Sequence, residues 1–402
     1  MDGLAASQGE SIADSMKKSP LLSIFLIVLV DVLGLTLILP LLPFYAESMG
    51  ASPFVATLLV SAYAICQFIA GPPLGHLSDR IGRRPVLLVS QMGTCAGFLI
   101  LAYAQSLWVV FLARIIDGLT AGNLTVAQAY IADVTDAENR TKAFSIIGIA
   151  FGLGFLVGPG VSGLLARFSP TYPIFAAAGL SFTSIMCTYF LLPAVVAHPH
   201  PELEQRFLRL NNLTQSFKDK RLAPMLWQFF AFTFAFSTFF SGFPLFAERR
   251  FTYDGAPFGN EEVGYVFAFS GLIGILIQGG GMGPLVKGFG ESRLVQMGFA
   301  TMAVSFALLS GVHAIPYLLV AVALLTFGSA ILRPSLTTLI TKHTARHRQG
   351  MVIGQMQSLM SIAQIIAPAI AGALIQAQLL SMWAIAGSVF CLIGWALILV
   401  TR

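Results

Sequence analysis

Long apolar segments alternate with short polar ones along most of the chain. Each apolar segment is about as long as the ~20 residues that a helix needs to cross the hydrocarbon core of a bilayer. A helix satisfies the backbone polar groups of such a segment within the segment itself. The pattern therefore predicts an all-α membrane protein with twelve transmembrane helices. The segments are residues 21–45, 53–75, 86–104, 107–132, 143–165, 173–193, 222–247, 261–282, 293–310, 315–340, 349–376 and 380–400.

The composition narrows the class of protein further. Hydrophobic residues make up 56% of the 402 residues and charged residues 10%, which excludes a set of soluble domains. The apolar segments are continuous and about twice as long as a barrel strand, which excludes an outer-membrane β-barrel. The first segment is too long for a removable signal peptide and lacks a small-residue cleavage site.

The longest hydrophilic stretch between segments, residues 194–221, divides the twelve segments into six and six. We interpret it as a cytoplasmic linker between two domains. The predicted organisation is an N-terminal cytoplasmic tail (1–20), an N-terminal six-helix bundle (21–193), the linker (194–221) and a C-terminal six-helix bundle (222–402).

The two halves repeat the same features. The pentapeptide "PFYAE" (43–47) ends the first segment and "PLFAE" (244–248) ends the seventh. Pro159 in the fifth segment has its counterpart in Pro368 of the eleventh. A six-helix unit duplicated in parallel is typical of transporters in which two bundles rock about a central site.

Basic residues fall mostly on one side of the predicted helices. If both termini are cytoplasmic, most of the 23 Lys and Arg residues lie in cytoplasmic loops, as the positive-inside rule requires. The net charge of +5 is thus a topology signal, and no basic soluble face interleaved with aromatic residues predicts a nucleic-acid partner.

The loop "GHLSDRIGRRP" (75–85) concentrates charge between the second and third segments. Gly75 and Gly82 allow a tight turn. Topology alone explains Arg80, but it does not explain Asp79, an acid in a loop otherwise rich in arginine.

This loop resembles the signature loop of the major facilitator superfamily. The resemblance implies that Asp79 caps the N-terminus of the eleventh helix near Gly350, where the helix dipole favours a carboxylate. It also implies that Arg83 ties Asp79 to Asp133 in a latch that holds the outward-open state. The latch residues are then Gly75, Asp79, Arg80, Gly82, Arg83 and Asp133. The second-half copy has Lys287 in place of the acid, so a latch there is expected to be weaker.

Further stretches extend the resemblance over nearly all of residues 20–400. "VDVLGLTLILPLLP", "RIIDGLTAGNLTVAQAYIADVTDAENR", "GLGFLVGPGVSG" and "RQGMVIGQMQS" resemble the twelve-helix drug/proton antiporters, closest to the tetracycline exporters. The family implies the major facilitator fold, two pseudo-symmetric six-helix bundles, and a place in the bacterial inner membrane.

The fifth segment carries the antiporter motif of that family, with Gly154, Gly158, Pro159 and Gly163. Glycines one turn apart permit close contact between helices, and proline removes a backbone hydrogen bond and allows a bend. Generic small-residue packing is the alternative interpretation.

Four ionisable residues lie well inside predicted helices: Asp31, Arg114, Asp117 and Arg333. Each costs at least about 2.5 kcal/mol at the bilayer centre, so each is a functional candidate. Low dielectric favours an uncharged carboxyl group and a nearby arginine favours a charged one, so Asp31 is predicted to carry the proton, with Arg114 tuning it. Asp117 is a second proton site or a cation contact. Alternatively, Arg114 and Asp117, three apart on one helix, form a structural pair.

Candidate substrate contacts are aromatic, polar and charged. Nine phenylalanines lie between Phe229 and Phe246, most of them expected to face lipid or packing neighbours. The remainder, Phe236 and Phe240 among them, could offer rings to a flat or cationic solute. The predicted substrate contacts are Asp31, Arg114, Gln128, Phe236, Phe240, Arg333 and Gln357.

The sequence thus predicts a secondary transporter that exports lipophilic small molecules in exchange for protons. A transporter of organic anions or lipid-like solutes that uses Arg114 and Arg333 is the second interpretation, and a non-transporting receptor the third. We expect no cofactor, no metal site and no enzymatic activity, because no nucleophile–base set or metal cluster occurs. The expected partners are the small-molecule substrate, protons and the lipid bilayer, and the chain is expected to act as a monomer.

Overall fold

The computed structural model describes residues 20–135, 140–193, 217–344 and 349–400, and these ranges are almost entirely helical. The first half contains α2 (Pro20–Ile38), α3 (Leu41–Ser48), α4 (Pro53–Ile81), α5 (Arg83–Ala102), α6 (Leu107–Thr120), α7 (Asn123–Val134), α8 (Arg140–Ala166) and α9 (Tyr172–Leu191). The second half contains α12 (Leu222–Arg250), the strands β1 (Thr252–Tyr253) and β2 (Ala256–Pro257), α13 (Asn260–Leu276), η1 (Ile277–Gly281), α14 (Met282–Gly311), α15 (Ile315–Lys342), α16 (Gln349–Gln376) and α17 (Leu380–Val400).

The twelve predicted spans are confirmed, but three of them are irregular. The first is broken between α2 and α3 at Leu39–Pro40, and the fourth between α6 and α7 at Ala121–Gly122. The eighth contains the π-helical turn η1, and the backbone turns from the eighth to the ninth at Gly290, where φ is 72°. The breaks in the first and fourth spans were not predicted.

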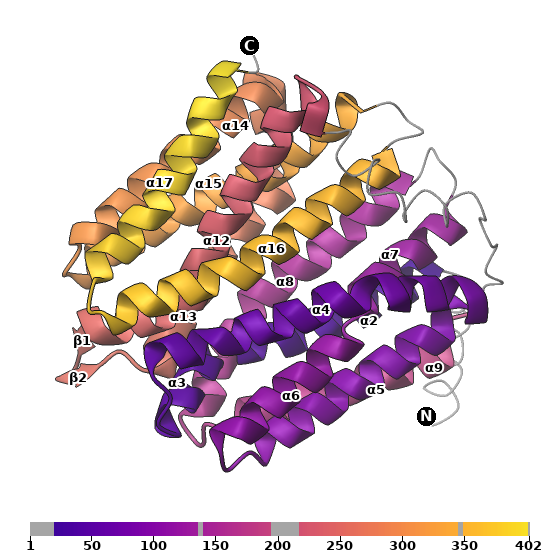
Figure 1. Cartoon of the computed structure of the whole chain (residues 1–402), viewed down its shortest axis with the longest axis horizontal. Helices are drawn as coiled ribbons and strands as arrows, with labels where there is room; N and C mark the ends of the chain where they lie inside the picture. The colour runs from indigo at the N-terminus through magenta and orange to yellow at the C-terminus, as the bar shows by residue number, and fades with distance from the viewer. Residues whose placement is uncertain (1–19, 136–139, 194–216, 345–348, 401–402) are drawn as a thin grey trace, which may run out of the picture.

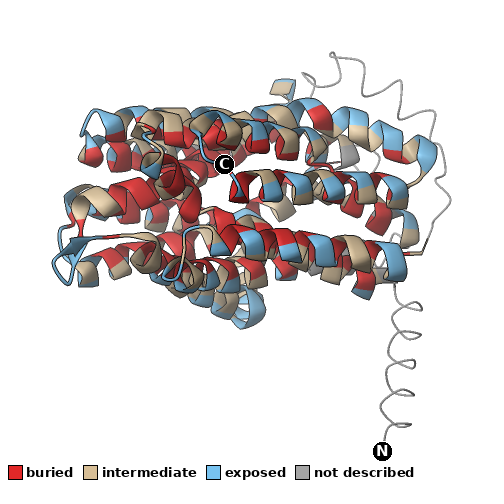
Figure 2. Cartoon of the chain, turned by 90° about the horizontal axis from the view of Figure 1, so that it is seen from below, coloured by how far each residue is buried: buried red, intermediate tan, exposed pale blue. Residues whose placement is uncertain are grey.

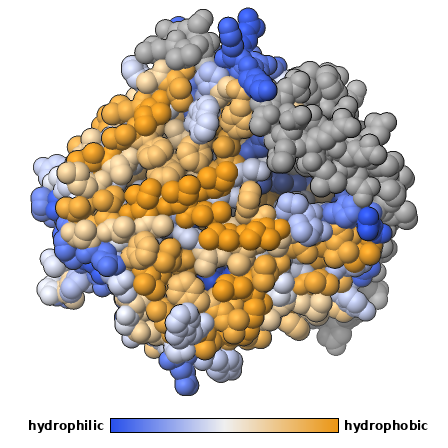
Figure 3. All heavy atoms as spheres, in the orientation of Figure 1, coloured by the Kyte–Doolittle hydropathy of each residue, from blue (hydrophilic) through white to orange (hydrophobic). Residues whose placement is uncertain are grey.

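The lengths and apolar character of the helices are those of membrane-spanning segments. Among the described residues, ten helices are long and apolar enough to span a bilayer, and one of them, Asn260–Gly311, covers two predicted spans. The remaining span is α8, whose apolar part is Gly152–Ala166. The face of the molecule seen in Figure 3 is largely apolar. Large exposed hydrophobic side chains of the chain include Ile69 at 61% exposure and Leu276 at 66%. Such large exposed side chains are what contact with lipid tails requires.

The two halves form two adjacent bundles, seen in indigo-to-magenta and in orange-to-yellow (Figure 1). α8 packs against α13 and α16 packs against α4, so each half contributes one helix to each of two seams. Buried residues lie mainly where helices face one another (Figure 2). The α12 helix is the most enclosed of these spans, because 83% of the residues in its most apolar stretch are buried.

Both seams rest on glycines at equivalent positions of the repeat. A Cβ atom added to Gly163 of α8 would lie 3.2 Å from the Cα of Glu261, at the start of α13. A Cβ atom on Gly372 of α16 would lie 2.9 Å from the Cα of Phe54, at the start of α4. Close approach of backbones at these points requires glycine. The predicted repeat is therefore visible in how the halves meet.

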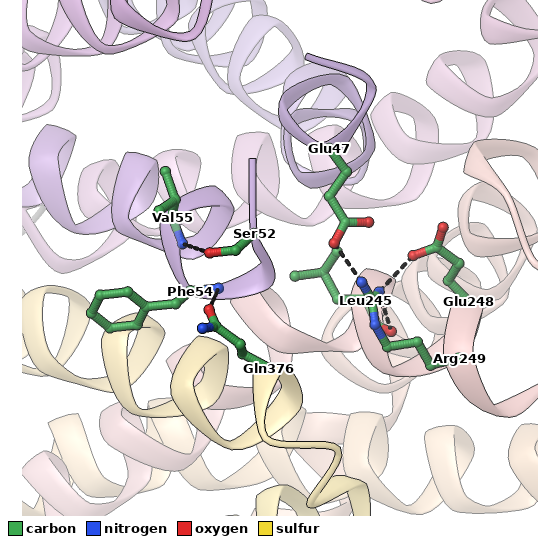
Figure 4. A network of polar contacts seen from close by, with 8 residues as sticks. All are labelled: Glu47, Ser52, Phe54, Val55, Leu245, Glu248, Arg249 and Gln376. Carbon is green, nitrogen blue, oxygen red and sulfur yellow. Dashed lines mark hydrogen bonds and ion pairs between the residues drawn. The ribbon is translucent and has the colours of Figure 1, made fainter. Parts of the chain in front are cut away.

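The contacts that join the halves close the end of the molecule that carries the β1–β2 hairpin, which we call the hairpin end. Here the backbone N–H of Phe54 donates to Gln376 Oε1 at 3.3 Å (Figure 4). Deeper along the same seam, Ser61 Oγ donates to the carbonyl of Ile365 at 2.7 Å. At the other seam, Arg167 forms an ion pair with Glu261.

Candidate functional site

The break in the fourth span lies where helices pack too closely for a side chain at Gly122. A Cβ atom on Gly122 would lie 2.8 Å from Ser90 Oγ and 3.0 Å from a methyl carbon of Leu74. The chain leaves α6 after Thr120 and starts α7 at Asn123, so the interrupted backbone adjoins polar side chains of α5. Interrupted helices in membrane proteins are tolerated where protein or a cavity surrounds the exposed backbone.

Asp31, in the middle of α2, lies beside this break. The side chains next to its carboxyl group are Gln91 of α5, Asn123 of α7 and Ser184 of α9. Gln91 Nε2 donates to Ser184 Oγ at 2.7 Å, which links two of these neighbours. The structure therefore places Asp31 among uncharged polar groups contributed by three helices.

Several oxygens of this cluster are buried without a hydrogen-bond partner. They are Asp31 Oδ1, Gln91 Oε1 and Asn123 Oδ1, and Ser90 Oγ beside Gly122 is unsatisfied as well. Buried polar groups are normally satisfied, and each unsatisfied one is costly. A group that supplies hydrogen-bond donors, such as a proton on the Asp31 carboxyl or water molecules, would relieve this cost. The cluster is thus chemically suited to hold a proton.

Arg114 and Asp117 of α6 form an ion pair. Arg114 Nη2 lies 2.9 Å from Asp117 Oδ2, and both side chains are 4% exposed. The guanidinium carbon of Arg114 lies 5.6 Å from the ring centroid of Tyr63 and 5.8 Å from that of Phe98. Arg114 is thus neutralised by Asp117 and enclosed by aromatic rings, whereas the neighbours of Asp31 are mostly uncharged.

Arg333 of α15 has a different environment. Its side chain is exposed, its only hydrogen-bond contact among the described residues is a 4.0 Å approach to Met360 Sδ, and no described carboxylate forms an ion pair with it. An unpaired guanidinium is expensive inside a membrane unless water or a ligand solvates it. Arg333 is therefore available to an anionic group.

Most of the α12 phenylalanines are buried in the C-terminal bundle, so packing is the main role of this aromatic run. Phe236 and Phe240 are only partly buried. Their ring centroids are 4.6 Å apart, and Phe240 also contacts Phe155 of α8 at 5.1 Å. These two rings therefore lie at the boundary between the bundles, where a solute between the halves would meet them.

The predicted glutamines occupy different environments. Gln128 of α7 is partly buried and Gln357 of α16 is exposed. Gln357 is therefore the more accessible of the two.

The signature loop forms an ion-pair network within the first half. Arg83 Nε lies 2.8 Å from Asp133 Oδ2, and Arg83 also pairs with Asp79 and donates to Ser78 Oγ at 2.6 Å. Gly82, with φ at 97°, makes the turn between α4 and α5. Residues 345–348, just before α16, lie outside the described residues. The capping of α16 by Asp79 therefore stays a prediction.

The antiporter-motif residues of α8 face two directions. A Cβ atom on Gly154 would lie 2.5 Å from Val32, and one on Gly158 would collide with Thr36, so these glycines seat α8 against α2 of the same bundle. The carbonyl of Pro159 and the backbone of Gly163 face α13 of the opposite bundle. One motif thus sets both the packing of the first bundle and its seam with the second.

Sequence reasoning missed the polar neighbours of Asp31, which are Gln91, Asn123 and Ser184. Each lies within an apolar segment, and uncharged polar residues are too common there to mark a site when read alone. The dipeptide Ala121–Gly122 in front of Asn123 was the one available signal of a helix break. Among the described residues, no group of three or more His, Cys, Asp and Glu side chains could hold a metal ion.

The two bundles, the glycine seams and the charges buried between apolar helices define a membrane transporter of small molecules. The sequence profile of the Major Facilitator Superfamily matches residues 24–282 and 262–402. The chain belongs to this superfamily, whose members are transporters and not enzymes.

The sequences and structures of individual known proteins support this assignment. The class C tetracycline resistance protein of Escherichia coli is 32% identical over 362 residues, which cover 87% of this chain and 88% of that protein. Multidrug resistance protein 2 of Bacillus subtilis is 27% identical, covering 94% of this chain and 95% of that protein. The crystal structure of a human organic anion transporter shares the fold at a TM-score of 0.73 and 23% identity, covering 95% of this chain and 99% of that one.

Proposed function

We propose that this protein exports lipophilic small molecules in exchange for protons by alternating access, with Asp31 as the proton carrier. The observation that carries the proposal is the position of Asp31, which has one buried, unpaired oxygen in a cluster of uncharged polar groups. Neutral surroundings let a carboxyl group change charge without breaking an ion pair. The tetracycline and multidrug resistance relatives support drug export.

The structure, closed at the hairpin end, fits one state of such a cycle. With both termini in the cytoplasm, as the basic loops predict, the hairpin end faces the outside of the cell. In that orientation this conformation is closed to the outside, and we propose that it belongs to a monomer in the bacterial inner membrane. The glycine seams α8–α13 and α4–α16 are the surfaces along which the bundles would rock.

Counterflow in proteoliposomes tests the function. A panel of cationic, neutral and anionic lipophilic solutes is assayed with and without an imposed pH gradient. Exchange of cationic or neutral solutes that becomes uphill under the gradient is the expected result. Exchange that ignores the gradient would contradict proton coupling, and no exchange of any solute would contradict export of this class.

Organic anions are the second candidate substrates, because Arg333 is exposed and has no described acidic partner. The human protein of the same fold is an organic anion transporter, which agrees with this candidate. Arg114 is a weaker anion contact than Arg333, since Asp117 already neutralises it.

Replacing Arg333 separates the two substrate classes. Arg333→Gln is expected to weaken the binding of anionic solutes by roughly tenfold, the loss of one charge-assisted hydrogen bond of about 1.5 kcal/mol. Cationic solutes should bind as well or better, because an uncompensated positive charge repels them. Arg333→Lys is the matched control that keeps the charge. Equal weakening of both classes would assign Arg333 to packing instead.

The latch prediction concerns Asp79. Asp79→Asn is expected to shift the population toward inward-facing states, because the amide interacts more weakly than a carboxylate with a helix N-terminus. Spin-label distances across the end opposite the hairpin end should lengthen. Lys287→Gln, in the second-half copy of the loop, is the control expected to change little. An unchanged distance distribution in Asp79→Asn would rule out the latch.

A further inference from the structure

Two acids from the repeated pentapeptide meet at one arginine at the hairpin end (Figure 4). Arg249 Nη2 lies 2.5 Å from Glu47 Oε1, and Arg249 Nη1 lies 2.6 Å from Glu248 Oε2. Arg249 Nη1 also donates to the carbonyl of Leu245 at 3.2 Å. We call Glu47, Glu248 and Arg249 the acid–arginine triad. It joins α3 of the first bundle to α12 of the second.

The two copies of the pentapeptide bring two acids to the triad, but only one of them is followed by an arginine. Glu47 and Glu248 are counterparts, but the residue after Glu47 is Ser48 and the residue after Glu248 is Arg249. Ser48 Oγ donates to the carbonyl of Tyr45 and brings no positive charge. Two carboxyl groups therefore share a single guanidinium.

Other charged groups at the hairpin end have partners elsewhere or lie in solvent. Arg250 donates to the carbonyls of Val312 and Ser310, at 2.9 and 3.2 Å. Arg167 pairs with Glu261 and donates to Tyr265. Glu262 accepts from the backbone N–H of Gly259 at 2.8 Å, and Asp254 is exposed in the hairpin turn. The first turn of α4, which packs on α3, carries no ionisable side chain. None of these groups supplies a second positive charge to the triad.

The triad is largely withdrawn from water, with exposures of 16% for Glu47, 21% for Arg249 and 31% for Glu248. The two carboxyl groups are within hydrogen-bonding reach of each other. If both carboxyl groups were ionised at this short separation, the single positive charge of Arg249 would leave a net negative charge in a partly buried site. Binding one proton removes that charge and supplies the missing donor between the two acids.

We infer that Glu47 and Glu248 form a proton-binding site, shared between the two bundles, that exists only while the hairpin end is closed. Opening this end separates α3 from α12, so each acid becomes solvated by itself and releases the shared proton. The closed state then holds one proton more than the open state. By linkage, the ratio of closed to open molecules falls as pH rises, by up to about tenfold per pH unit.

This site has a consequence for transport that rests on the proposed function. If the hairpin end faces the outside, external acid stabilises the closed outer gate. That favours the half of the cycle in which protons enter the cell. The site would thus couple the outer gate to the proton supply independently of Asp31.

Spin-label distances at the hairpin end test the site. Labels are placed at Ser48→Cys and Thr252→Cys, both exposed and one in each half, after the four native cysteines are replaced. All measurements are made in nanodiscs on proteins that also carry Asp31→Asn, so that titration of Asp31 does not contribute. The result for the proton site at the hairpin end is then independent of whether Asp31 carries the transported proton. The closed fraction is followed from acid to alkaline pH.

Three variants give distinct expected results. The unmodified triad should open as pH rises, with the slope of one proton. Glu47→Gln should stay closed without pH dependence, because its amide donates to Glu248 and removes the like charge. Arg249→Gln should open at alkaline pH and close again at acid pH, where the protonated acid pair holds by itself. Arg167→Gln, at the other seam, is the control expected to lower the closed fraction equally at every pH.

Three results would overturn the inference. They are a closed fraction independent of pH in the unmodified triad, a Glu47→Gln variant that opens at every pH or keeps the slope, and an Arg249→Gln variant that acid does not close. The first two would reduce the triad to an ordinary ion pair. The third would show that Arg249, and not a shared proton, holds α3 to α12.

Discussion

An Asp31→Asn variant is expected to lose all uphill transport driven by a pH gradient. The amide mimics the protonated carboxyl permanently, so no proton is exchanged as access alternates. Downhill exchange of a solute identified by counterflow should survive, because rocking of the bundles needs no titration of Asp31. The measurement is solute accumulation in proteoliposomes with an imposed proton gradient, beside counterflow without one.

Linkage gives an independent readout for the same residue. If solute and proton compete for the Asp31 site, each lowers the affinity for the other by the same factor. Solute binding should then release a proton in unbuffered detergent solution, and solute affinity should improve as pH rises. Asp31→Glu is the control that keeps the exchangeable proton. Full accumulation by Asp31→Asn would remove Asp31 from the mechanism and leave Asp117 as the other intramembrane acid.

Removing Arg114 alone is expected to destabilise the protein by roughly 3–5 kcal/mol, because it leaves Asp117 as an unpaired buried charge. Arg114→Met and Asp117→Leu combined should recover most of that loss, since an apolar pair of similar volume needs no desolvation. Thermal unfolding in detergent of the single and double variants measures both effects.

Transport by the double variant then decides the role of the pair. Gradient-driven accumulation near the unmodified level would make Arg114 and Asp117 a structural pair. Loss of gradient-driven accumulation in a stable double variant would assign the pair to proton coupling. A double variant no more stable than Arg114→Met would contradict the neutralisation that the 2.9 Å contact implies.

The sequence by itself determined the class and plan of this protein. Runs of about 20 apolar residues allow few structures in a bilayer other than helices, so the number of spans followed from hydropathy. The duplication was visible because glycine and proline recur at equivalent positions, and in the structure Gly163 and Gly372 occupy matching places in the two seams. Costly charges inside apolar segments marked Asp31, Arg114, Asp117 and Arg333.

Only the tertiary structure decided which of these groups meet. Arg114 and Asp117 lie three residues apart, and local spacing suggested their pair, but the polar neighbours of Asp31 come from three other helices. Glu47 and Glu248 were recognised as repeat counterparts, yet nothing in the sequence placed both at Arg249. Contacts between residues hundreds of positions apart depend on helix rotation and bundle closure. Those are set by the sum of many small packing contacts, such as the glycine seams, and leave no periodic pattern along the chain.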